Sequence, residues 1–139
     1  MIAQHLHDLL TAALPDTTPV LLPEQVQEPL SGGKPGQPSG LRAYLQAHAG
    51  GYVQVEEPQG ITSDGLTASY WVPVASLAPT AEACAQLAAQ VALTLNGTPH
   101  LPGPHPEVTP SMPALLQSGA WMCRPTYHVL TLAGAVASG

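Results

Sequence analysis

Six histidines are the side chains of this sequence best suited to chemistry, because imidazole binds metals and exchanges protons near neutral pH. His5 and His7 are two residues apart, which places them on different faces of a helix. His100 and His105 lie in a proline-rich segment shortly before Glu107, and a loop can fold such ligands inward. These spacings match no zinc pattern. We predict no metal or cofactor, and keep a metal- or ligand-binding α/β domain using the segment from His100 to His105 as the alternative.

The two cysteines offer little support for nucleophilic catalysis. Cys123 and His128 are five residues apart on an expected strand, so their side chains point to opposite faces. Cys84 falls on the packing side of an expected helix, where a thiol is inert. The sequence contains no nucleophile elbow, phosphate loop or paired-carboxylate motif. We therefore predict that the protein is not an enzyme and that both cysteines are buried thiols rather than a disulfide.

The composition favours a protein that works by contact with other chains. The chain has 139 residues, of which 45% are hydrophobic and only 9% are charged, well below the usual quarter. Its surface must then be uncharged or covered by other subunits, although a compositional bias of the source genome would also explain so few charged residues.

The net charge of −6 includes three cations, too few to hold a phosphate backbone. With no signal or membrane-spanning pattern, we expect a soluble, intracellular protein.

The first part of the chain predicts one helix and a long loop. Leucines recur at helical spacing from Ile2 to Leu14, which indicates a helix of about three turns. A short apolar run at Val20–Leu22 reads as a strand, and the segment 29–40, rich in glycine and proline, reads as a loop or arm. Leu41–His48 predicts a short helix, with a strand as the alternative.

The middle part predicts a hairpin followed by a helix. Tyr52–Glu56 and Thr67–Val74 alternate like half-buried strands, with a turn expected at Gly60–Gly65. In the second strand Ala68, Tyr70, Val72 and Val74 share one face, opposite Thr67, Ser69 and Trp71. The alanine-rich run from Thr80 to Leu95 predicts a helix that begins at a Thr80 cap and ends at Asn96-Gly97.

The last part predicts an extended segment and a final strand. Residues 98–113 contain many prolines and read as an excursion, after which Ala114–Leu116 forms a helical turn. Met122–Leu132 reads as the final strand, with Pro125 at an edge or bulge because proline has no N–H. The fold class is therefore α+β, a single domain over residues 1–139. In it a small mixed or antiparallel sheet packs against one long helix and an N-terminal helix.

Exposed aromatic side chains are the best candidates for contacts with a partner. Trp71 faces away from Tyr70, which is expected in the core, so Trp71 marks an outward face. The candidate interface residues come from that face, the two extended segments and the second tryptophan; they are Thr67, Ser69, Trp71, Pro35, Gln37, His100, His105 and Trp121.

The order of these elements resembles that of tail terminator proteins, also called tail-completion or minor tail proteins, of long-tailed bacteriophages. The resemblance covers most of the chain. It rests on the order of elements and on two patches: Ser69–Val74 leading into the helix with Ala89–Gly97, and Arg124–Val129 near the end.

The resemblance implies a subunit of a homo-oligomeric ring, expected to be a hexamer, that caps the tail tube at the neck of the virion. Such a ring ends tube polymerisation and joins the tail to the head connector, while DNA passes through its lumen without specific binding. The implied partners are copies of the chain itself, the tail tube protein and the head–tail connector, with no membrane. The protein would be made in the host cytoplasm. Another neck or tail-tube subunit is the alternative within the same class.

Overall fold

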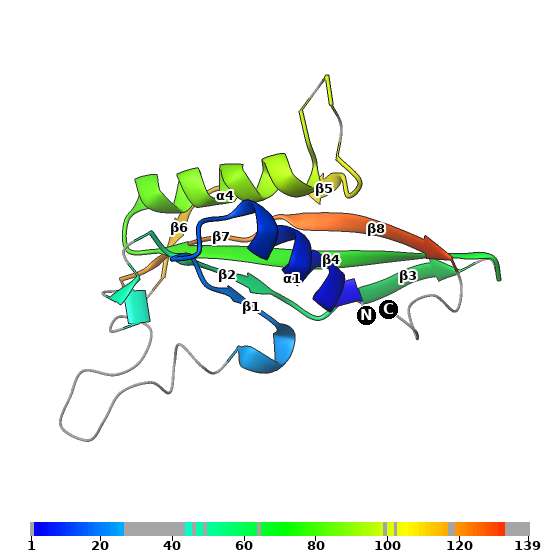
Figure 1. Cartoon of the computed structure of the whole chain (residues 1–139), viewed down its shortest axis with the longest axis horizontal. Helices are drawn as coiled ribbons and strands as arrows, with labels where there is room; N and C mark the ends of the chain where they lie inside the picture. Colours follow the sequence, from blue (N-terminus) through cyan, green and yellow to red (C-terminus); the bar gives the residue numbers. More distant parts are fainter. Residues whose placement is uncertain are drawn as a thin grey trace.

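A computed structural model describes residues 2–26, 44–45, 47–48, 50–63, 65–98, 100–101, 103–116 and 119–132. Within them the elements follow in the order α1 (Ile2–Ala13), β1 (Val20–Leu21), the 3-10 turn η1 (Pro23–Gln25), β2 (Tyr52–Val55), β3 (Gln59–Ser63), β4 (Thr67–Ala78), α4 (Ala81–Leu95), β5 (Glu107–Thr109), β6 (Ala114–Leu115), β7 (Trp121–Cys123) and β8 (Thr126–Leu132). Together they form an α+β fold with a mixed sheet, as the sequence predicts (Figure 1).

The twelve-residue strand β4 runs through the whole sheet (Figure 1). Its first half pairs with β3 on one side and β8 on the other, and its second half pairs with β2 and β7. The short strands β5 and β6 extend the sheet beyond β8 and β7, and β1 pairs in parallel with β2. All the other pairings are antiparallel, so β1 alone among the described strands makes the sheet mixed.

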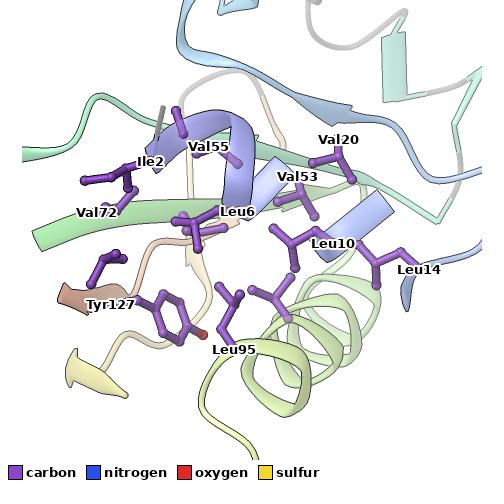
Figure 2. Packing of buried hydrophobic residues seen from close by; sticks show 14 of the residues in the cluster. Ile2, Leu6, Leu10, Leu14, Val20, Val53, Val55, Val72, Leu95 and Tyr127 are labelled. Carbon is purple, nitrogen blue, oxygen red and sulfur yellow. The ribbon is translucent and has the colours of Figure 1, made fainter. Parts of the chain in front are cut away.

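The main hydrophobic core lies between the two helices and one face of the sheet. Figure 2 shows Leu6 and Leu10 of α1 and Leu95 of α4 pointing toward side chains of the sheet. The sheet contributes alternate residues, because successive side chains of a strand point to opposite faces. The sheet residues of this core are Val20, Val53, Val55, Val72, Val74, Tyr127 and Val129.

A second, smaller core covers the opposite face of the sheet at one end. Tyr52 pairs with Leu77, and both side chains pack with Leu21 and Leu45 in this cluster. Residues 44, 45 and 47 are helical, which confirms the predicted short helix at these positions, whereas His48 is not helical. Residues 41–43 and 46 of that prediction and the arm at 29–40 lie outside the described residues. One end of the sheet is thus buried on both faces.

Both ends of α4 follow the predicted signals. The Thr80 hydroxyl accepts a hydrogen bond from the Ala83 N–H at 3.1 Å, and Glu82 places a carboxylate in the first turn. The helix ends at Asn96, and Gly97 follows with a φ of 80°. A positive φ of this kind favours glycine, so the Asn-Gly pair is a helix stop.

Two expectations for the connecting segments are wrong. The turn expected at Gly60–Gly65 is instead part of strand β3 (Gln59–Ser63) as far as Ser63, because this segment lies beside the first half of β4 and pairs with it, with a register shift between Gly60 and Thr62. The chain reverses only afterwards, where Gly65 has a φ of 88°. Ala114–Leu115 is strand β6 instead of a helical turn, since both residues pair with β7.

The expected final strand is divided in two, β7 and β8, at Arg124 and Pro125. Pro125 has no N–H to donate, but its carbonyl accepts from the Val74 N–H at 3.0 Å, which keeps the chain against β4 across the break. The sequence placed Pro125 at an edge or bulge, but not at a break between two strands.

We predict that two leucines of α4 differ sharply in their effect on stability. Leu95 is fully buried in the main core and Leu93 is 58% exposed, so Leu95→Ala leaves a cavity and Leu93→Ala does not. Leu95→Ala should lower the free energy of unfolding by about 2–5 kcal/mol, and Leu93→Ala by less than about 1 kcal/mol. Urea unfolding followed by circular dichroism measures both. Equal losses would show that α4 does not pack as described.

Candidate interaction surfaces

The outward face of β4 carries three of the predicted interface residues together. Thr67, Ser69 and Trp71 alternate along the strand on the side away from the helices. Cross-strand partners extend this face on both sides. We call the resulting set the sheet face; its residues are Gln59, Thr67, Ser69, Trp71, His128 and Leu130.

The sheet face is accessible and carries no carboxylate, ammonium or guanidinium group. Trp71 is 39% exposed and Leu130 is 59% exposed, and the neighbouring small side chains are half-buried. The second core covers the outward face only at the other end of β4, around Leu77. An exposed tryptophan near an exposed leucine on an uncharged surface is suited to contact with another protein.

The segment after α4 forms a second exposed feature. The described residues between α4 and β5, namely 98, 100–101 and 103–105, project beyond the end of α4, and we call them the projection (Figure 1). Its base is held by backbone hydrogen bonds from the Gly103 N–H to the Asn96 carbonyl and from the His105 N–H to the Leu95 carbonyl. A Cβ at residue 103 would lie 2.3 Å from the Leu95 oxygen, so this approach requires glycine. Leu101 is 79% exposed, and His100 beside it is also exposed.

His105 lies at the base of the projection rather than on its surface. It is only 6% exposed, and its Nε2 lies 3.3 Å from Nε2 of His5 on α1. The two rings meet edge to face with an interplanar angle of 89°. Burial lowers the pKa of His105, and His5 and His128 lower it further. The structure thus pairs His105 with a histidine 100 residues away in sequence.

The other candidate residues lie apart from the sheet face. Trp121 is half-buried and packs against Ala78, Cys84 and Cys123 on the helix side of the sheet. It therefore faces away from Trp71. Pro35 and Gln37 lie outside the described residues.

Both cysteines are buried free thiols, as the sequence predicts. Each donates a weak hydrogen bond to a carbonyl, Cys84 to Ser76 and Cys123 to Ser111, both at 3.3 Å. Burial, with a smaller effect of the neighbouring Cys123, raises the pKa of Cys84 to about 11. Burial also raises the pKa of Cys123. Neither thiol is placed or activated as a nucleophile.

The charges of the described residues leave the surface acidic. Arg124 is the one cation among them, and its guanidinium donates to both Glu56 oxygens, at 2.5 Å and 2.7 Å. The hydrogen bonds that Arg124 donates to Glu56 raise the pKa of Arg124. This bidentate ion pair links Glu56, just after β2, to Arg124, at the break between β7 and β8. Within the described part of the chain, no positive patch remains that could hold nucleic acid.

Comparison of the chain with models of known protein families, with curated proteins and with solved structures finds no significant match. No helix in the described part of the chain is long and apolar enough to cross a membrane. Among the described residues, no group of three or more His, Cys, Asp or Glu side chains lies close enough together to hold a metal ion.

Two features of these surfaces were not predicted. Leu130 belongs to the sheet face through its pairing with Ser69, and this register follows only once β8 is placed beside the first half of β4. The contact of His5 with His105 joins α1 to the projection. No spacing in the sequence signals it.

We predict that both native thiols react very slowly with a disulfide reagent. A rise in the pKa of Cys84 from 9.0 to about 11 lowers its thiolate fraction about a hundredfold at neutral pH, and burial slows access further. Both should react at ordinary rates after unfolding in guanidinium chloride. Absorbance of the released thiophenolate measures the rate. Ser63→Cys, at an exposed position of β3, is the positive control. Fast reaction of the native wild-type chain would contradict the described burial.

Proposed function

We propose that this chain is a structural subunit of a phage tail, assembled as a homo-oligomeric ring that caps the tail tube at the neck. The ring ends tube polymerisation and joins the tail to the head connector, which places the protein in the virion. The order of its elements supports this proposal through the resemblance to tail terminator proteins. The proposal assigns the chain no enzymatic activity.

The sheet face is the observation that carries the proposal. Copies of a chain with a net charge of −6 repel one another unless they meet through surfaces without acidic groups. Trp71, Leu130 and the polar side chains around them provide such a surface. We therefore infer that a second copy of this chain covers the sheet face.

A ring needs two different contact surfaces on each subunit, because its interfaces are head-to-tail. The projection supplies a second exposed apolar side chain, Leu101, and lies at the end of α4. Helix α4 packs on the face of the sheet opposite Trp71. We infer that the projection of one copy meets the sheet face of the next.

The acidic surface is consistent with DNA passing through a lumen. Nucleic acid is retained by several cations on one face, and release of counterions provides most of the affinity. In the described residues the single cation, Arg124, is already paired with Glu56. A channel lined by such a surface would let DNA slide without binding it.

We predict that wild-type protein forms a discrete oligomer, expected to be a hexamer, in light scattering coupled to size exclusion. Trp71→Glu places a carboxylate on the sheet face and should yield monomers. Leu93→Glu, on exposed α4 surface, is the matched control and should keep the oligomer. Wild-type monomers at high concentration would contradict the ring, whereas stacked tubes would support the tail-tube alternative.

Mixing two variants tests the head-to-tail arrangement. Trp71→Glu keeps an intact projection and Leu101→Glu keeps an intact sheet face, so an equimolar mixture should form mixed dimers while each variant alone is monomeric. If two sheet faces instead meet each other, Leu101→Glu alone would dimerise.

Adding wild-type protein to the polymerising tail tube protein should give short tubes with a cap at one end, seen by negative-stain electron microscopy. Tubes of unchanged length would contradict the capping function.

A further inference from the structure

The contact between His5 and His105 has the dimensions of a metal site. A tetrahedral zinc ion with Zn–N bonds of 2.0–2.1 Å holds two imidazole nitrogens about 3.3 Å apart. The two Nε2 atoms lie 3.3 Å apart. The same tetrahedral arrangement places the centroids of two ligating rings about 5.2 Å apart. The observed centroid distance is 5.3 Å.

The two histidines are held in place by separate elements. His5 projects from α1, whose apolar residues are anchored in the main core. His105 is fixed by its backbone N–H, which donates to the Leu95 carbonyl at 2.9 Å, and by burial of its ring. Because both rings are already positioned, a metal ion would order little additional chain when it binds.

The geometry points to a zinc site formed by Nε2 of His5 and Nε2 of His105, with water in the remaining coordination positions. Imidazole is a preferred ligand of Zn²⁺, and of Cu²⁺ and Ni²⁺ among other divalent ions. Both Nε2 atoms must present a lone pair to the ion, so binding selects the tautomer of each ring that carries its proton on Nδ1. The ion would then clamp the projection to α1. This inference does not depend on the proposed function.

Two features limit the affinity of this site. It has two protein ligands, whereas structural zinc sites usually have four. Nδ1 of His105 is buried and has no hydrogen-bond partner within the described residues, so the site lacks the outer-shell acceptor that tightens most zinc sites. We therefore expect a dissociation constant in about the micromolar range.

Calorimetric titration of the EDTA-treated full chain with Zn²⁺ tests the site. Wild-type protein should bind one ion per chain, and His5→Gln should weaken binding at least about tenfold. His7→Gln on the same helix and His100→Gln on the projection are matched controls and should bind like wild type. His5 is exposed, so His5→Gln should fold normally, which circular dichroism checks.

A second measurement identifies the ligating atoms. In ¹⁵N-edited spectra of the histidine rings, Zn²⁺ should shift Nε2 of His5 and Nε2 of His105 and leave His48 and His128 unchanged. No binding at a hundred-fold excess over the expected dissociation constant would overturn the inference and leave a hydrogen bond only. Equal binding by wild type and His5→Gln, or a loss in both control variants, would also overturn it. An outcome of this kind leaves the ring proposal unaffected, because light scattering tests that separately.

Discussion

Alternation along β4 is the constraint on which the rest of the structure depends. The strand is long enough to pair with four others, and its side chains divide the molecule into two sides. Val72 and Val74 enter the core beneath α1 and α4, while Trp71 and Ser69 point the other way. A shift of one residue in register would exchange these two sets, so burial of the valines also fixes the position of the tryptophan.

The elements best predicted from the sequence are those specified by neighbouring residues. Alternation between Thr67 and Val74 gives the strand and its two faces, and the Thr80 cap with the Asn-Gly stop gives α4. Segments whose structure is decided by distant partners were not predicted. Residues 60–63 look like part of a turn until β4 lies beside them, and Ala114–Leu115 becomes a strand only through pairing with β7.

The candidate interface residues also differ in whether the sequence alone could place them. Trp71, Ser69 and Thr67 could be grouped in advance because they lie on one strand. Trp121 could not be separated from them, because the sequence does not show which side of the sheet β7 presents; its pairing with Ala78 places it on the helix side. The meeting of His5 and His105 requires the complete fold, since it joins the first helix to a segment that follows the last one.

The register shift between Gly60 and Thr62 has a consequence for orderly assembly. Strand β3 lies beside β4, and along its other side the described strands provide no partner, while its own residues carry no charge. A regular edge of this kind would invite open-ended strand addition and fibre growth. The irregularity interrupts the row of free backbone groups. The irregularity therefore protects the chain from open-ended association edge to edge.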